Sequence, residues 1–297
     1  MTIRSTAAIM LAATALIAAP AYAQEDIEPA VPNIDLDDAV FSGDFVTVGV
    51  GGAYTPSYQG SDDYVLSVLP VIIGSYGGID VNPRAGGITV DFVPDNDSGL
   101  SFDAGIAARF RGDRASQIED EVVEQFGELD TAIEVGPSVG VNIDGVLNPF
   151  DTVSFGTAVM WDVAGAHEGM VVNPVASYTT PLSRAVIGNL SLSAEWADED
   201  YHDYYFRVDP INNVNVAPNS DALPGFEPDS GGFKSLSATM LVGIDLDGNA
   251  LNGGWGIVVL GGYTRLVGDA ADTPFTSIRG SADQWLGALG ITYTFGL

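Results

Sequence analysis

The segment QWLGALGITYTFGL, residues 284–297, alternates between two kinds of side chain. Every second residue from Trp285 to Leu297 is large and apolar or aromatic, apart from Gly287, while the residues between them are mostly small or hydroxylated. A period of two is the pattern of a β-strand, whose successive side chains point to opposite faces. A strand of a soluble sheet turns its large face to a core and its polar face to water. Here the large face continues to the last residue, which indicates a strand that faces lipid.

The same alternation recurs along the chain in segments of about ten residues, which is the signature of a membrane barrel. Short turns and longer polar stretches alternate between the segments, as short periplasmic turns and long external loops do in such barrels. The longer stretches are residues 112–130, 199–232 and 268–284. Seven segments alternate clearly: 45–54, 100–110, 132–144, 153–163, 190–196, 235–246 and 255–263. Three more are strand-like with ambiguous faces: 64–76, 79–93 and 170–181.

The pattern therefore predicts an all-β fold, a transmembrane antiparallel β-barrel of the outer membrane. Bacterial barrels have an even number of strands. We expect twelve strands, with residues 76–93 forming two short ones. The alternative is ten, if two ambiguous N-terminal segments form one bent strand. A soluble β-sandwich would bury the same residues, but it has no need for a large aromatic face that reaches the last residue.

The N-terminal segment MTIRSTAAIMLAATALIAAPAYA, residues 1–23, predicts a secretory signal that is cleaved after Ala23. Its apolar run is shorter than the roughly 20 residues of a spanning helix. We expect a periplasmic extension at 24–43 and the barrel at 44–297, in the outer membrane of a Gram-negative cell. The formal net charge of −30 argues against a nucleic-acid partner.

Several charged residues fall on the faces opposite the large apolar ones. Facing lipid near the midplane would cost about 2–4 kcal/mol for an arginine, so we expect these side chains in the lumen. Two interpretations stay open: a paired network that fills a narrow lumen, or a cation-preferring pore, because carboxylates outnumber arginines. The residues are Asp103, Arg109, Arg111, Glu134, Asp162, Glu195 and Asp245.

Three polar runs raise the question of metal binding. DEDYHDYY (198–205) offers oxygen ligands, which calcium prefers, but it lacks the spacing and the glycine of an EF-hand. We interpret it as a solvated external loop with interfacial tyrosines. GDAADTP (268–274) and QGSDD (59–63) are expected to hold the bases of loops.

The two histidines, His167 and His202, lie at predicted loop ends, outside any recognised catalytic motif. We expect no enzymatic activity, no cofactor and no metal.

Four stretches, in the right order, resemble the MipA/OmpV family of outer-membrane proteins. They are GVGGAYTPSYQGSDDY (49–64), EVGPSVG (134–140), DEDYHDYYFRVDP (198–210) and YTRLVGDAADTPFTSIRGSADQWLGALGITYTF (263–295). The resemblance implies a scaffold in the outer-membrane lipid that links a murein-cleaving lytic transglycosylase to a murein synthase. The rival functions are a small-solute or cation pore, and a surface adhesin or antigen that acts through the loops at 112–130 and 199–232.

The terminal strand also resembles the assembly signal of outer-membrane proteins. Those proteins usually end in phenylalanine, whereas here Phe295 is followed by Gly296 and Leu297. We expect Tyr293, Phe295 and Leu297 to carry the signal.

Overall fold

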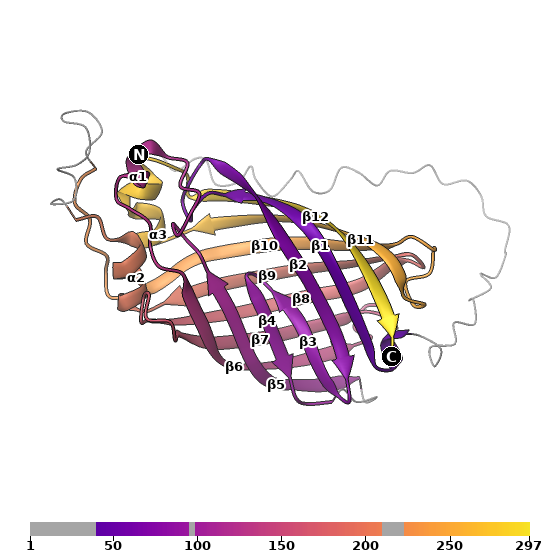
Figure 1. The fold of residues 1–297 in the computed structure, drawn as a ribbon. Coiled ribbons are helices and arrows are strands. Elements are labelled where there is room, and N and C mark those ends of the chain that lie inside the picture. Colours follow the sequence, from indigo (N-terminus) through magenta and orange to yellow (C-terminus); the bar gives the residue numbers. More distant parts are fainter. Residues whose placement is uncertain (1–39, 95–98, 210–222) are drawn as a thin grey trace, which may run out of the picture. The chain divides into compact units, whose positions relative to one another are not determined.

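The computed structural model describes residues 40–94, 99–209 and 223–297, and these form a closed antiparallel β-barrel (Figure 1). Within those ranges the barrel has twelve strands, and each pairs with its neighbour in the chain. The strands are β1 (Phe45–Pro56), β2 (Tyr64–Tyr76), β3 (Ile79–Arg84), β4 (Gly87–Asp91), β5 (Leu100–Arg111), β6 (Ala132–Asp144), β7 (Thr152–Asp162), β8 (Met170–Ser183), β9 (Val186–Ala197), β10 (Gly232–Asp245), β11 (Gly254–Leu266) and β12 (Asp283–Gly296).

The prediction of twelve strands is confirmed, and the alternative of ten is wrong. Residues 76–93 hold the end of β2 and two short strands, β3 and β4. Glycines at positive φ, Gly77 and Gly78, make the tight turn that separates β2 from β3. The predicted signal segment 1–23 and most of the predicted extension 24–43 lie outside the described residues. Val40–Ser42 form a short 3-10 helix, η2, just before β1.

The terminal strand closes the barrel. β12 pairs with β1 from Phe45↔Gly296 to Tyr54↔Gly287. The N–H of Leu297 donates to the carbonyl of Asp44 at 2.9 Å, which extends this ladder by one more step. The alternation seen in the sequence therefore runs to the last residue because the last strand is a wall strand with one face outward.

The two faces of the wall differ as the alternation predicts. Large apolar side chains on the outside are exposed, as Val50 and Leu289 are. Aromatic rings mark both ends of the outer surface: Tyr263 lies 4.8 Å from Trp285 at one end, and Trp255 lies 5.0 Å from Tyr293 at the other. These pairs match the aromatic girdles of a membrane barrel.

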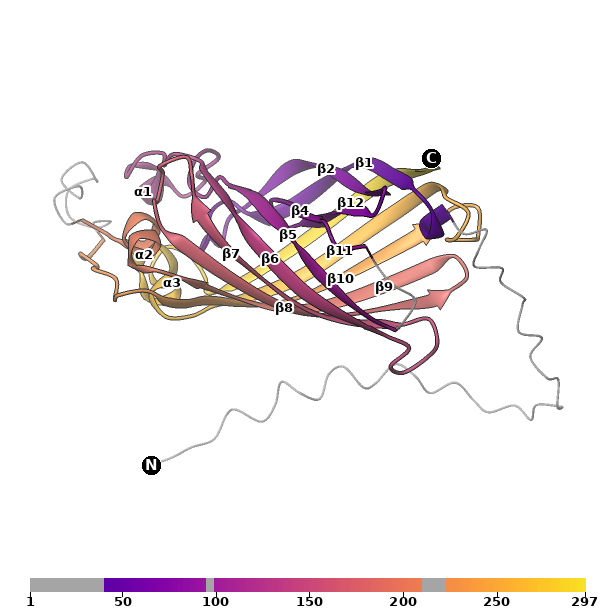
Figure 2. The same cartoon turned by 90° about the horizontal axis from the view of Figure 1, so that it is seen from below.

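The two ends of the barrel differ in their connections. At the end where β1 begins and β12 ends, the links between strands are mostly short turns. We call this end the turn end. At the opposite end, the loop end, four short helices gather (Figure 2). They are α1 (Glu121–Glu124), α2 (Glu199–Phe206), α3 (Asp269–Asp272) and α4 (Pro274–Ser277). In the described ranges, none of the helices is both long and apolar enough to cross a membrane.

Two irregularities interrupt the wall. The ladder between β9 and β10 shifts register between Phe233 and Ser235, which leaves Lys234 as the extra residue of a β-bulge. The ladder between β2 and β3 contains only three residue pairs, from Gly74↔Val81 to Tyr76↔Ile79.

Candidate functional site

A network of charged side chains spans the interior near the loop end. Arg109 and Arg111 on β5 both bind Glu134 on β6 and Glu195 on β9. Arg109 Nε donates to Glu134 Oε2 at 2.7 Å, and its Nη1 donates to Glu195 Oε2 at 2.7 Å. The bonds to Glu134 join neighbouring strands, whereas three strands separate β5 from β9, so the bonds to Glu195 cross the lumen.

A third cation belongs to the network. Lys234 Nζ lies 2.5 Å from Glu195 Oε1, and the lysine side chain is only 2% exposed. The bulge in β10 is the cause, because it turns both Lys234 and Ser235 inward while Phe233 and Leu236 stay exposed outside. Strict alternation cannot place two successive residues on one face, so the sequence did not reveal Lys234. The sequence signal for the bulge was the spacing of three between the two outward residues Phe233 and Leu236, where strict alternation gives two or four.

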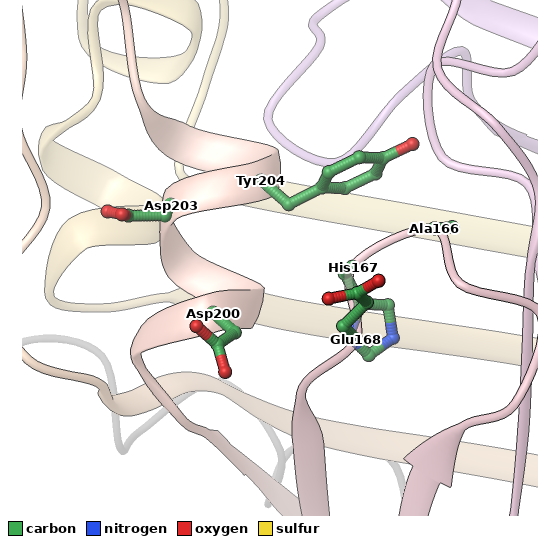
Figure 3. Close-up of a pocket in the computed structure, with 6 residues that line it drawn as sticks. All are labelled: Ala166, His167, Glu168, Asp200, Asp203 and Tyr204. Carbon is green, nitrogen blue, oxygen red and sulfur yellow. The ribbon is translucent and has the colours of Figure 1, made fainter.

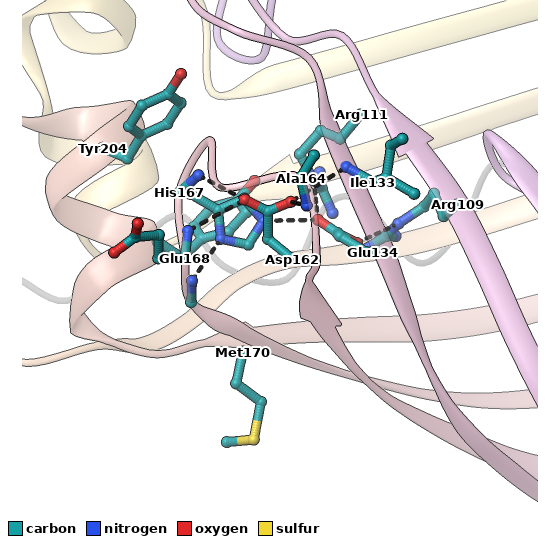
Figure 4. Close-up of polar contacts among 12 residues, drawn as sticks. Arg109, Arg111, Ile133, Glu134, Asp162, Ala164, His167, Glu168, Met170 and Tyr204 are labelled. Carbon is teal, nitrogen blue, oxygen red and sulfur yellow. Dashed lines mark hydrogen bonds and ion pairs between the residues drawn. The ribbon is translucent and has the colours of Figure 1, made fainter.

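The network also reaches the turn between β7 and β8 (Figure 4). His167 Nε2 lies 3.2 Å from Glu134 Oε1, and His167 Nδ1 accepts from the N–H of Gly169. With Nδ1 as an acceptor, Nε2 carries the proton and donates to the carboxylate. Both ring nitrogens are therefore engaged, and Glu134, with a fully buried side chain, has three partners.

Asp162 has a different role from the network carboxylates. Its oxygens accept the backbone N–H groups of Ile133, Ala164, His167 and Glu168 (Figure 4). The carboxylate thus shapes the 163–169 turn and places the His167 ring against Glu134.

Two other predicted lumen residues lie apart from the network. Asp103 on β5 accepts from the side-chain amide of Asn142 on β6 at 2.8 Å. Asp245 accepts the N–H groups of Asp247 and Asn249 at the turn end. The structure thus joins Arg109, Arg111, Glu134 and Glu195, and it places Asp103, Asp162 and Asp245 elsewhere.

The helix α2 lies directly over the network. The ring of Tyr201 is fully buried, 5.0 Å from the Arg111 guanidinium and 4.9 Å from Lys234 Nζ. Cations over an aromatic face are attracted by its quadrupole. Burial raises the pKa of Tyr201 well above its usual value, so its hydroxyl stays protonated.

The interpretation of residues 198–205 as a solvated loop is wrong. Asp198 caps the start of α2, where its side chain accepts the N–H of Tyr201. His202, Tyr205 and Phe206 are buried with Tyr201. The run looks polar because its acidic residues occupy the first turn and the outer side, while Tyr201, Tyr205 and Phe206 are buried against the barrel.

The two other polar runs hold α2 and the loop bases. Asp269 Oδ2, from GDAADTP, lies 2.7 Å from His202 Nδ1, and the Thr273 hydroxyl donates to the Phe206 carbonyl at 2.8 Å. In QGSDD, the N–H of Gly60 donates to Gln284 Oε1. Among the described residues no group of three potential ligands is placed to hold a metal ion.

A cleft of about 310 Å³ opens on the outside of this cap (Figure 3). Its lining includes His167, Glu168, Asp200, Asp203 and Tyr204. In the part of the chain that the structure describes, neither His167 nor His202 is hydrogen-bonded to a hydroxyl group.

Comparison with known proteins bears on the family. A family model described as MltA-interacting protein MipA matches residues 48–295. The chain is similar to the solved NanC porin, with a TM-score of 0.47 and 10% identity over 83% of this chain and 98% of that chain. It is also similar to an outer membrane channel from Pseudomonas putida F1, with a TM-score of 0.42 and 12% identity over 85% of this chain and 96% of that chain. Among curated protein sequences no match was found.

The fold and the family agree on the compartment. A closed antiparallel barrel with an exposed apolar belt and aromatic girdles is suited to the hydrocarbon layer, so the protein lies in the outer membrane. The family match spans β1 to β12, and the chain belongs to the MltA-interacting protein MipA family.

Proposed function

We propose that this protein is an outer-membrane scaffold that binds a murein-cleaving lytic transglycosylase and a murein synthase during cell-wall remodelling. The observation that carries the proposal is the family match over residues 48–295, since the family is named for its interaction with MltA.

The filled lumen supports a scaffold that binds partner proteins rather than a pore that conducts ions. The network and α2 occupy the interior at the loop end, where Glu134, Lys234 and Tyr201 are all buried. Three cations, Arg109, Arg111 and Lys234, surround two carboxylates there. This ratio is the reverse of the carboxylate excess on which a cation-preferring pore depends.

A murein enzyme works in the periplasm, and the turn end carries a suitable surface for it. The turn between β6 and β7 is held by the Asp151 carboxylate, which accepts the N–H groups of Val146, Leu147 and Asn148. Leu147 is 77% exposed on this turn. A fixed turn with an exposed apolar side chain loses little entropy when it is buried against a partner.

The experiment is a binding assay with two matched variants. The purified barrel in detergent is immobilised, and a purified MltA-type lytic transglycosylase from the same cells is passed over it. Leu147→Asp should weaken retention at least about tenfold, which corresponds to about 1.4 kcal/mol. Ile278→Asp is the control, because Ile278 is an exposed apolar residue at the loop end.

The outcomes separate the scaffold from its rivals. Retention of the enzyme by wild type and by Ile278→Asp, with loss in Leu147→Asp, supports the scaffold. No retention by wild type contradicts it. Equal loss in both variants would place the contact elsewhere and contradict the role given to the turn end.

A further inference from the structure

The wall between β2 and β3 is paired over a small part of its length. Only Gly74, Ser75 and Tyr76 of β2 pair with β3. In the described part of the chain, β2 from Tyr64 to Ile73 has a strand partner on the β1 side alone. At about 3.3 Å per residue this is roughly 30 Å of strand edge. We call this interval the seam (Figure 1).

Two hydrogen bonds show which backbone N–H and C=O groups of β2 point to β1 and which point to the seam. Ser57 N–H donates to Asp63 O, and Leu297 N–H donates to Asp44 O. In antiparallel ladders the residues that exchange bonds alternate. Odd-numbered residues of β2 therefore bond to β1, and the polar backbone groups of even-numbered residues point to the seam.

Two prolines lie at the positions where the ladder stops. Continuing the register past Gly74↔Val81 would next pair Ile72 with Pro83 by hydrogen bonds, and Pro83 has no N–H to donate. Pro70 on β2 is also even-numbered, so its missing N–H is on the seam side. A proline on each strand thus interrupts the β2–β3 ladder. Hydrogen bonds in the existing register therefore cannot extend along the seam and close it.

The seam has fixed borders. The β3–β4 hairpin is tied to β5, because the N–H of Phe110 donates to the carbonyl of Gly86 at 2.9 Å. At the loop end the N–H of Gln59 donates to Asp113 Oδ1 at 2.8 Å, which joins the β1–β2 link to the segment after β5. In Figure 1 the hairpin ends well short of the loop end that β2 reaches.

The inward face of β2 is unlike that of its neighbour. β1 turns Thr47, Gly49, Gly51 and Ala53 to the lumen, whereas β2 turns apolar side chains inward. Leu69 is the most accessible of these, at 41% exposed, although it points inward. The inward side chains of β2 are Val65, Ser67, Leu69, Val71, Ile73 and Ser75. Four of the six are apolar, so most of this face, like the outer one, fits hydrocarbon.

We propose that the seam is a lateral opening that admits the acyl chain of an amphiphile from the bilayer into the lumen. The chain would lie along the inward apolar face of β2. The polar head would hydrogen-bond to the unpaired backbone groups of Leu66, Val68 and Ile72, which are costly to leave unsatisfied in hydrocarbon. The occupant is an acyl chain rather than an added β-strand, because Pro70 interrupts the donors that such a strand needs. This goes beyond the scaffold and does not depend on it.

The first test measures contact with lipid from inside the barrel. The chain has no cysteine, so single cysteines can carry a fluorophore at chosen sites. Leu69→Cys reports on the seam, Val68→Cys on the lipid face, and Ser177→Cys on the inward face of the paired wall. In vesicles of phospholipid with brominated acyl chains, quenching at position 69 should exceed that at 177 at least about twofold, because water fills a closed lumen.

The second test makes the inward face of β2 polar while the fluorophore stays at position 69. Val65→Asn with Val71→Asn places two amides along the path of the acyl chain, where a polar group is costly to bury in hydrocarbon. The control is Val175→Asn, which lies on the inward face of the paired wall. The double variant should lower quenching at position 69 to the level at 177, and the control should not.

Three results would overturn the proposal. One is quenching at position 69 no greater than at 177 in the open barrel. Another is quenching at 69 that does not change in the Val65→Asn, Val71→Asn variant. A third is efficient disulfide dimerisation of Ile72→Cys alone in vesicles, which would mean that a second copy covers the edge of β2.

Discussion

Glu195 is the carboxylate on which three cations depend. It binds Arg109, Arg111 and Lys234 at 2.7, 2.7 and 2.5 Å. Breaking a buried ion pair by removing one partner leaves uncompensated charge, which costs about 3–5 kcal/mol. We therefore expect Glu195→Gln to destabilise the folded barrel by about this amount. Reversible unfolding in urea with lipid vesicles measures it.

Lys234→Met makes the matched comparison. The cluster holds three cations and two carboxylates, so removing one cation leaves the remaining charges balanced. We expect a smaller loss than in Glu195→Gln. The exposed Glu227, 3.6 Å from Arg207, gives the control Glu227→Gln, for which we expect less than about 1 kcal/mol. A Lys234→Met loss as large as that of Glu195→Gln would contradict the charge balance described above.

Asp151 makes the turn between β6 and β7 sensitive to acid. Burial favours the neutral carboxyl, but hydrogen bonds from the Tyr178 hydroxyl and from the N–H groups of residues 146–148 outweigh it and hold the pKa of Asp151 below its usual value. A lowered folded pKa adds stability above the unfolded value, about 3.9 for aspartate, and that stability is lost as the pH falls through the folded value.

We expect the amide of Leu147 to be protected from hydrogen exchange at neutral pH and to lose protection below about pH 4. Exchange rates corrected for their intrinsic pH dependence measure this. Asp151→Asn should show low protection at every pH. Protection in wild type that is unchanged at the lowest pH would mean that the carboxylate does not hold the turn.

Among the strands, β12 tests the assignment of faces. Ile291 lies outward and is opposite Ile257 of β11 and Val50 of β1. An arginine on the lipid face near the midplane costs about 2–4 kcal/mol, and we expect this loss for Ile291→Arg. The inward control is Ser177→Arg on β8, because Thr292 is buried and has no room for a longer side chain. Equal losses in the two variants would contradict the assigned faces.

The end of β12 should also direct assembly. Tyr293 and Phe295 lie outward near the turn end, with ring centroids 4.5 Å apart. If the assembly signal ends at Phe295, a chain without Gly296 and Leu297 should reach the outer membrane, whereas Phe295→Ser should remain periplasmic and be degraded. If Leu297 is part of the signal, the shortened chain should itself fail. Fractionation and blotting distinguish these results, and normal outer-membrane levels of Phe295→Ser would exclude this strand as the signal.

The strands were predictable because lipid outside and water inside impose a strict period of two. The split of residues 76–93 into β3 and β4 was predicted from the even strand number of bacterial barrels, and Gly86, at a φ of 75°, lies in the turn between the two strands. The period of two could not give the register, so the end of the β2–β3 ladder at Gly74↔Val81 was not foreseen. Pro70 and Pro83 carry that information only once the pairing is known.

The loop end was less predictable, because its contacts join residues far apart in the chain. Thr273 meets Phe206, and His202 meets Asp269, across separate loops. No local period in the sequence encodes such contacts, so the sequence alone predicts a solvated loop where the structure has α2. The network residues on regular strands were foreseeable, whereas Lys234 depends on a bulge that breaks the period.

For the whole barrel, the network predicts that few ions pass through the lumen. With Arg109, Arg111 and Lys234 bound to Glu134 and Glu195 under Tyr201, we expect wild-type protein to show little steady conductance in planar bilayers. The double variant Arg111→Ser and Lys234→Ser removes two long side chains from the constriction and should conduct more. Wild-type conductance as large as that of the double variant would favour the pore over the scaffold.

The pairing of β1 with β12 gives the sheet a cyclic order, in which no strand is first. Asp44 and Leu297 are already hydrogen-bonded to each other, so a short linker could join them and the chain could be opened instead at the two-residue turn between β8 and β9. Such a circular permutant would keep every ladder but would end in β8. In the natural order β12 both closes the barrel by pairing with β1 and carries the C-terminal strand that the insertion machinery would recognise. The permutant would assign these two roles to different strands.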